Sequence, residues 1–387
     1  MNRREFCRQM AALGGASLLT SCSRYLPAPA TVPDSPTAVS TTTAAATTLP
    51  PATHAATPNP VPGEIEPPAA TPSPHATAQS TATAEAGVAP IALVRTTDRE
   101  QGVRKALELL NINPIRGNNV LFKPNLNSAD PPPASTHPQV MRSLLLAMQD
   151  MGARSITLGE RSGMGDTRQV MQRTGVFTLA DELGFATAVL DELDEQDWVV
   201  RQSGDFHWMD GFAIPRLLLD SDCVIQTCNL KTHKYGGHFT MSLKNSVGFV
   251  AKRTSSNGYN YMSELHNSPY QRHMIAEINT AYKPALILMD GVEAFLDGGP
   301  AQGRKAQTGV ILAGTDPIAM DAVGVAILRL FGATAAVSKG SIFDLEQIAR
   351  AVELDLGVDT PQKINLITPD AASLDFAGQV SNVLVAG

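Results

Sequence analysis

Short apolar runs alternate with segments of helical periodicity from residue 91 onward. Residues 91–95, 120–122 and 155–158 have the composition of buried strands, and residues 99–110 and 138–151 repeat apolar side chains at helical spacing. Strand, helix and strand in this order form a βαβ unit, whose crossover is right-handed by default. The pattern predicts one α/β domain over residues 89–387, with a mainly parallel sheet and crossover helices on both faces.

The first residues have the form of an export signal. Arg3, Arg4 and Phe6 precede a modest apolar run, and residues 19–22 end in Cys22 in a sequence that resembles a lipobox. We therefore expect a twin-arginine lipoprotein signal over residues 1–22, lipidation of Cys22, and export to the outer side of the cytoplasmic membrane or to the periplasmic or outer-membrane face. The alternative is a short uncleaved hydrophobic anchor, although the apolar run is short for a membrane span.

Residues 23–88 are rich in Pro, Thr, Ala and Ser and contain few large apolar side chains. Such a segment cannot bury enough surface to offset its ordering entropy, so it is expected to be a disordered stalk. The whole chain has a formal net charge of −7, and the predicted domain has no basic run. This charge balance argues against nucleic acid as a partner. The partners expected instead are a small-molecule ligand and, through the lipid anchor, the membrane.

Cysteine is sparse in the predicted domain, where Cys223 and Cys228 lie on one predicted strand. Their odd spacing places them on opposite faces of that strand, so they are not expected to form a disulfide. The sequence has no Cys-x-x-Cys motif, so no iron–sulfur cluster is expected, and the identity of any other cofactor stays open.

Residues 222–250 carry the densest group of polar and titratable side chains. An apolar strand begins at Cys223, and Lys231 and His233 follow near its expected carboxyl end, ahead of a predicted helix over residues 239–250. Ligands of open α/β sheets bind at the carboxyl ends of strands. Other polar residues follow predicted strands or lie on that helix: Lys123, Asn125, Glu160, Asn229, Lys244, Asn245 and Asp290.

These residue types favour a site for a small anionic or polar substrate. Lys231 and Lys244 are expected to bind the anion, His233 to act as a general base, and Asp290 to orient or neutralise. Nearby lysine charge would lower the pKa of His233 and keep it neutral. The remaining candidates for substrate contacts are Lys123, Asn125, Asn229, Asn245 and Glu160.

Two other interpretations stay open for the same residues. The lysines could be ordinary solvated surface residues. Alternatively, Glu160, Asp290 and Asp321 could hold a hard divalent cation.

Several of these fragments together resemble the family known as domain of unknown function 362. They are Lys123-Pro124-Asn125, Gly159-Glu160, residues 229–233, Leu243-Lys244-Asn245, Asp290-Gly291, Gly299-Pro300 and residues 316–321. Many members carry a ferredoxin-like domain with cysteine clusters, which this sequence does not contain, so the resemblance implies a form without electron transfer. The resulting hypothesis is a membrane-anchored extracytoplasmic enzyme of unknown reaction, and the alternative is a non-catalytic ligand-binding lipoprotein.

Overall fold

The computed structural model describes residues 87–254 and 258–386. The predicted signal with Arg3, Arg4 and Cys22 lies outside the described residues, as does nearly all of the predicted stalk. Among the helices that are described, none has both the length and the apolar character needed to cross a membrane.

A nine-stranded sheet forms the centre of the described part, and β8 joins it through β7 alone. In spatial order its other strands are β11 (Ile364–Ile367), β1 (Ala89–Arg95), β10 (Lys305–Gly314), β9 (Leu286–Phe295), β7 (Cys223–His233), β2 (Asn119–Lys123), β3 (Ser155–Glu160) and β4 (Ala186–Val189). β10 is antiparallel to both β1 and β9, and the remaining neighbours along this order are parallel. The predicted α/β fold with a mainly parallel sheet is therefore confirmed.

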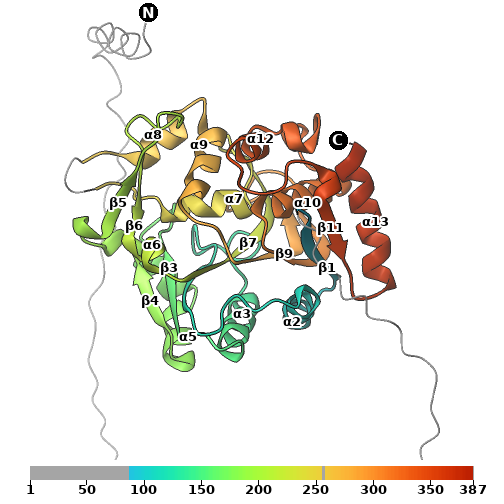
Figure 1. Cartoon of the computed structure of the whole chain (residues 1–387), viewed down its shortest axis with the longest axis horizontal. Coiled ribbons are helices and arrows are strands. Elements are labelled where there is room, and N and C mark those ends of the chain that lie inside the picture. The colour runs from blue at the N-terminus through green and yellow to red at the C-terminus, as the bar shows by residue number, and fades with distance from the viewer. Residues whose placement is uncertain (1–86, 255–257, 387) are drawn as a thin grey trace, which may run out of the picture. The chain divides into compact units, whose positions relative to one another are not determined.

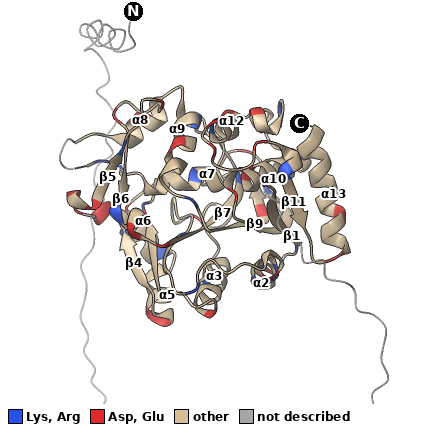
Figure 2. Ribbon diagram, viewed as in Figure 1, with Lys and Arg blue, Asp and Glu red and all other residues tan. Residues whose placement is uncertain are grey.

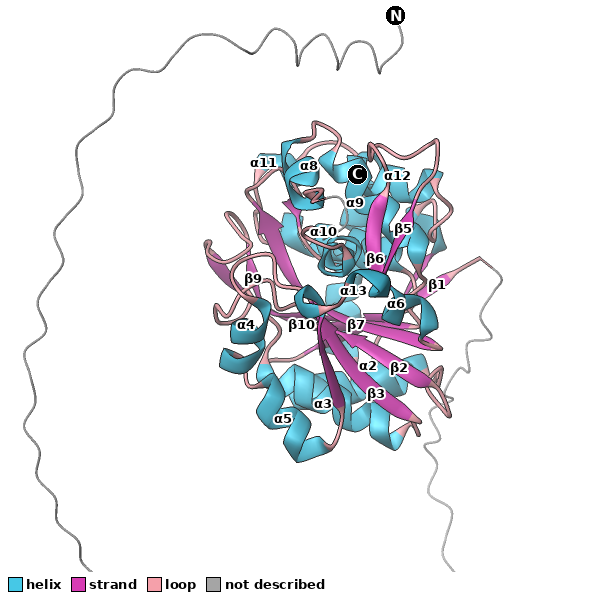
Figure 3. Ribbon diagram, turned by 90° about the vertical axis from the view of Figure 1, so that its left-hand side faces the viewer, coloured by secondary structure: helices cyan, strands magenta, loops and turns pink. Residues whose placement is uncertain are grey.

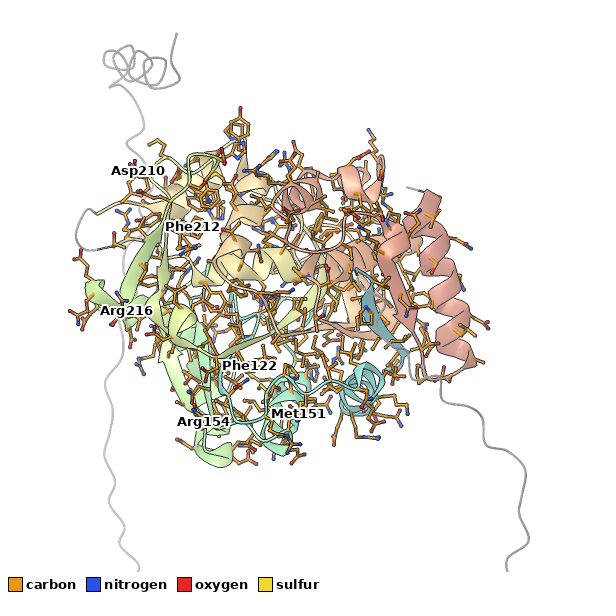
Figure 4. All side chains as sticks on the ribbon, in the orientation of Figure 1. Phe122, Met151, Arg154, Asp210, Phe212 and Arg216 are labelled. Atoms are coloured by element: carbon orange, nitrogen blue, oxygen red, sulfur yellow. The ribbon has the colours of Figure 1, made fainter. Side chains whose placement is uncertain are left out.

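Helices cover both faces of this sheet (Figures 1 and 3). The described helices are α2 (Arg99–Leu110), α3 (Pro138–Asp150), α4 (Thr167–Arg173), α5 (Val176–Leu183), α6 (Arg216–Asp220), α7 (Ser242–Asn245), α8 (Tyr261–Asn267), α9 (Gln271–Ile278), α10 (Pro317–Leu330), α11 (Ala335–Ser338), α12 (Glu346–Glu353) and α13 (Ala371–Ala386). Helices α2 to α5 pack on one face, around a core that contains Phe122 (Figure 4). Helices α7 to α10, α12 and α13 pack on the other, together with the β5 (Trp198–Arg201) and β6 (Phe212–Pro215) ribbon.

β7 is the central strand for the site. All eleven of its residues are buried between β9 and β2, as expected for a strand covered on both faces. Cys223 packs in the core beside α2 and α3, whereas Cys228 packs in the core beside α10, so the two free thiols lie on opposite faces.

Two predicted elements differ from the structure, and one helix of the structure was not predicted. Residues 239–250 form β8 (His238–Phe239), the single-turn helix α7 and the 3-10 turn η3 (Ser246–Phe249), not one long helix. Residues 252–268 are polar and rich in Ser, Asn and Tyr, a composition that predicts a long surface loop, but they contain α8. The carboxyl-terminal helix α13 was not predicted, and its apolar side chains complete the core beside α10.

Candidate functional site

A cavity of about 460 Å³ opens where β2, β3 and β7 end side by side. We call it the basic cavity. The described residues that line it are Lys123, Asn125, Asn127, Glu160, Arg161, Gly163, Met164, Lys231, His233, Tyr235, Thr240, Lys244, Asn245, Val247, Gly248, Lys252, Arg253, Asn260, Met262, His266 and Pro300. The strand ends, the turn after β7 and helices α7 and α8 therefore all contribute side chains to one space.

Positive charge dominates the lining of the basic cavity. Its basic side chains are Lys123, Arg161, Lys231, Lys244, Lys252 and Arg253, whereas Glu160 supplies its single carboxylate among the described lining residues. This is a local excess of cations in a chain whose net charge is negative. Figure 2 shows the basic part of α7, which lies against the sheet. Such an excess favours binding of an anion.

Lys123 and Glu160 form a buried ion pair at the floor of the cavity. Lys123 Nζ lies 2.6 Å from Glu160 Oε1, and both side chains are almost fully buried. The carboxylate also accepts hydrogen bonds from the backbone amides of Leu126 and Arg161, at 2.9 and 2.8 Å. Burial lowers the pKa of Lys123, and the charge of Glu160 opposes that effect. Glu160 is thus committed to protein partners, and its charge is balanced by Lys123.

Lys231 extends from β7 into a fully buried position beside the cavity. Its Nζ donates hydrogen bonds to Asn125 Oδ1, at 2.7 Å, and to the backbone carbonyl of Ala134. In the described part of the chain no carboxylate lies within ion-pair distance of it. Burial, reinforced by the charge of Lys244, lowers the pKa of Lys231 to about 7.

Lys244 and Arg161 add two more buried cations without a carboxylate partner among the described residues. Lys244, on α7, is 8% exposed and makes no hydrogen bond there, and burial followed by the charge of Arg161 lowers its pKa to about 8. Arg161, directly after β3, donates to the backbone carbonyls of Val250, at 2.9 Å, and Val247. Carbonyl dipoles solvate the guanidinium but do not neutralise it, so the positive charge remains available to a ligand.

His233 lines the cavity and is held in its neutral form. It is buried, and its Nδ1 has no hydrogen-bond partner in the described structure. Burial and the nearby charges of Lys244 and Lys231 hold its pKa well below the usual range, so the imidazole is neutral near pH 7. Gly237 allows this arrangement, because a Cβ there would lie 3.1 Å from His233 Nδ1 and 3.2 Å from Lys244 Cε.

The model of the family described as "Domain of unknown function (DUF362)" matches residues 120–326. The chain belongs to this family. All of the strand ends and turns that line the basic cavity lie within the DUF362 match, so the cavity is part of the family's own domain.

Two further similarities were found. The "Thylakoid-associated protein sll1697" of Synechocystis sp. is 26% identical over 220 residues, which are 56% of this chain and 65% of that protein. The chain therefore spans about two thirds of that relative's length. The lactate racemase apoprotein from Thermoanaerobacterium thermosaccharolyticum matches 55% of this chain and 51% of its own at 16% identity, with a TM-score of 0.35, which is too low to define a shared fold.

Most of the residues predicted to form the site line the basic cavity of the DUF362 domain. They are Lys123, Asn125, Glu160, Lys231, His233, Lys244 and Asn245. Asn245 orients its neighbours, because its Nδ2 donates to backbone carbonyls of Lys123 and Thr227 and its Oδ1 accepts from Asn125.

Asp290 does not line the cavity, contrary to the sequence-based expectation. The Asp290-Gly291 pair was interpreted as the end of a strand, but β9 continues to Phe295 and carries Asp290 within the sheet. Its carboxylate pairs with Arg99 of α2, with Oδ2 2.8 Å from Nε. Asp290 therefore has a structural partner on α2, outside the cavity lining, and is removed from the proposed catalytic group.

Asn229 and Asp321 also lie away from the cavity lining. Asn229 Nδ2 donates to the carbonyl of Pro133 at 2.7 Å. Asp321 of α10 accepts hydrogen bonds from the backbone amides of Ser242 and Leu243, at 2.7 and 3.1 Å, and burial raises its pKa to about 7. The carboxylate of Asp321 thus fixes the first turn of α7 from the side of α10.

The three predicted metal candidates are not brought together. Glu160 is paired with Lys123, Asp290 with Arg99, and Asp321 with backbone amides. Within residues 87–254 and 258–386 there is no group of three or more His, Cys, Asp or Glu side chains placed to hold a metal ion. The described residues do not fit the divalent-cation hypothesis.

Several lining residues were missed by the sequence analysis. They are Asn127, Arg161, Lys252, Arg253 and His266. Arg161 could have been found, because it directly follows the Gly159-Glu160 pair at the end of β3. No predicted strand end marked Lys252, Arg253 and His266, because they lie in a segment whose sequence predicts a surface loop.

Proposed function

We propose that this DUF362 domain is an enzyme that binds a small organic anion in the basic cavity and transfers a proton on it. The observation that carries the proposal is the pair of buried cations Lys244 and Arg161, which lie beside the buried amine of Lys231 and form no ion pair with a carboxylate in the described structure. Burying an unpaired charge costs several kcal/mol, so proteins rarely keep such groups without a counter-charge. An anionic ligand would supply it.

His233 gives the site its chemical capability. A neutral imidazole that lines the cavity can remove a proton from a bound anion, whose charge offsets that of the neighbouring lysines, while the cations stabilise the developing negative charge. Lys244 and Arg161 would hold the acid group of the substrate. Asn125 and Asn245 would fix the position of Lys231. Perturbed acid–base groups gathered in one cavity are typical of catalytic sites.

The alternative is a binding protein that holds the same class of ligand without changing it. The observation that favours it is Glu160, the cavity's carboxylate among the described lining residues. It is already paired with Lys123, which leaves His233 and His266 as the candidate bases besides the lysines.

For its location, we propose that the protein is exported and tethered by a lipid on Cys22. Support comes from Arg3, Arg4 and the residues before Cys22. The name of the Synechocystis relative, "thylakoid-associated", agrees with a location at a membrane surface.

Calorimetric titration of the full-length protein with malonate, pyruvate, 2-oxoglutarate and phosphate tests anion binding. At least one should bind, and Lys244→Met should weaken it by at least about tenfold, which corresponds to about 1.4 kcal/mol. Lys339→Met is the matched control, because Lys339 is exposed and lies outside the cavity lining. Absence of binding, or equal effects of the two substitutions, would overturn the proposal.

Proton transfer is tested separately with pyruvate and 2-oxoglutarate in deuterated water. NMR should show protein-dependent exchange of the hydrogens next to the carbonyl, and His233→Asn should abolish exchange while retaining most of the affinity. Binding without exchange would favour the non-catalytic alternative.

A further inference from the structure

The amine of Lys231 has a hydrogen-bond environment that anion binding alone does not explain. The inference drawn from it rests on the proposed function, because it concerns the substrate of the same cavity. Lys231 Nζ has two protein partners among the described residues, Asn125 Oδ1 and the carbonyl of Ala134. Both can accept hydrogen bonds from the amine.

The identity of the Asn125 atom that faces Lys231 is fixed by a chain of hydrogen bonds. Asn245 Nδ2 donates to the carbonyls of Lys123 and Thr227, at 3.4 and 3.2 Å, which can only accept. Asn245 Oδ1 must therefore face Asn125 Nδ2, which donates to it at 3.3 Å. The remaining polar atom of Asn125, its Oδ1, is then the one directed at Lys231.

These partners match a neutral amine. A neutral amine has two N–H groups and one lone pair, and here both N–H groups have acceptors. No described group donates a hydrogen bond to the lone pair, so it is free to react. A charged ammonium would instead carry a third N–H without a protein acceptor in the described structure. Burial and the charge of Lys244 also favour the neutral amine, since they lower the pKa of Lys231 to about 7.

We propose that Lys231 forms an imine with a small anion that carries a carbonyl group, such as a 2-oxo acid. Lys244 and Arg161 would bind the carboxylate of this substrate at the wall of the same cavity. His233 lies two positions beyond Lys231 on β7, hence on the same face of the strand, and also lines the cavity.

The step balances without any further reactant. The lone pair of Lys231 forms a C–N bond to the carbonyl carbon, and the carbonyl oxygen takes up the proton lost from nitrogen to give a carbinolamine. The hydroxyl group then leaves as water with the second nitrogen proton, and the C=N bond forms. His233, which lines the same cavity, relays these protons through its imidazole ring. The imine withdraws electrons from the neighbouring C–H bond, which makes that proton removable by His233.

Reductive trapping of the full-length protein tests the proposal. Pyruvate or 2-oxoglutarate is added with cyanoborohydride near pH 7, and the modified lysines are located by peptide mass spectrometry. We expect Lys231 to be labelled at least about tenfold faster than Lys234, because a pKa of about 7 leaves roughly a thousandfold more neutral amine than an ordinary lysine has at this pH. Lys234 is an exposed lysine three residues along the chain and serves as the internal control.

Three controls separate a specific reaction from adventitious labelling. Methyl pyruvate, which has the same ketone but no charge, should label Lys231 poorly. Malonate should protect Lys231 but not Lys234. Lys231→Arg should remove the label, whereas Lys234→Arg should leave it in place.

Labelling of Lys231 no faster than that of Lys234, or labelling on Lys244 instead, would overturn the imine. If calorimetry still showed anion binding in that case, the proposed function would stand without this inference. Because the comparison of Lys231 with Lys234 is made in the unmodified protein, it does not depend on whether a variant folds.

Discussion

At the scale of single residues, the unusual feature is lysine that is buried without an ion-pair partner in the part of the chain that the structure describes. Lys231 and Lys244 both lie in the interior, and their pKa values are lowered to about 7 and about 8, mainly by burial. The folded state therefore binds these protons more weakly than the unfolded chain, in which lysine has a pKa of about 10.4. The empty cavity is destabilised by charge at neutral pH, in the way that functional sites often trade stability for activity.

This difference predicts a specific pH dependence for Lys231. Its contribution to stability is fully present above pH about 10, where both states are neutral, and is lost as the pH falls to about 7. The Lys231→Met variant has no amine at this position, so it does not lose stability in this way as the pH falls. The free energy of unfolding of the variant relative to the wild type should therefore rise by up to about 1.4 kcal/mol for each pH unit from 10 down to 7, and then level off.

Denaturant titrations of the wild type and the variant across this pH range measure the slope. The hydrogen bonds lost by Asn125 and Ala134 shift the difference by a constant and do not change its slope. Lys339→Met, which removes an exposed lysine, should give a flat difference. If the difference in unfolding free energy between Lys231→Met and the wild type did not change with pH, Lys231 would be fully charged in the folded protein.

At the scale of secondary-structure elements, α7 is the critical piece, because it carries Lys244 and Asn245 into the cavity. A helix of four residues cannot be stable by itself. Its first amides, from Ser242 and Leu243, are held by the carboxylate of Asp321 on α10. The position of Lys244 in the cavity thus depends on the carboxylate of Asp321, which caps α7 from another helix.

Asp321→Ala should consequently weaken both stability and anion binding. Loss of the acceptor leaves two buried amides unsatisfied, which costs on the order of 1–3 kcal/mol of unfolding free energy. Anion affinity should fall by at least about tenfold, since Lys244 loses its fixed position.

Asp316→Ala provides the matched comparison in thermal unfolding and calorimetry. Asp316 also accepts two backbone amide hydrogen bonds, from Ala319 and Val358, each at 2.8 Å, but it lies outside the basic cavity. It should cost similar stability and leave anion affinity unchanged. Equal losses of affinity in both variants would show that Asp321 acts on global stability alone.

At the scale of the whole molecule, the proposed arrangement is a DUF362 domain held at a membrane surface by its first residues. The twin-arginine route exports proteins that are already folded, so the buried cavity would be complete before the protein reaches its final compartment. Such a protein would meet its substrate outside the cytoplasm, where the proposed lipid on Cys22 would limit how far it can diffuse.

Membrane fractionation of cells tests this arrangement. Cys22→Ala should release the protein from the membrane fraction, and replacement of both Arg3 and Arg4 by lysine should keep it inside the cytoplasm. Retention of the Cys22→Ala protein in the membrane fraction would contradict the lipid anchor and favour an uncleaved hydrophobic anchor instead.

The sequence alone determined much of the fold. The expected helix over residues 99–110 coincides with α2, and the expected strands at residues 91–95 and 120–122 lie within β1 and β2. These elements have strong local periodicity, which survives in the folded protein because their apolar faces are the ones that pack. The sequence also indicated that Lys123, Lys231 and His233 would meet, because the carboxyl ends of neighbouring parallel strands meet at one edge of a sheet.

Only the tertiary structure decided which charges are paired. Asp290 and Glu160 look alike in sequence, since both occur at an apparent strand end beside glycine. The pairing of β9 with β10 extends β9 past Asp290 and leaves its carboxylate with Arg99. Ion pairs join residues far apart in the chain, and no local pattern encodes them. That Lys231, Lys244 and Arg161 form no direct ion pair with a carboxylate in the described structure is for the same reason a property of the fold.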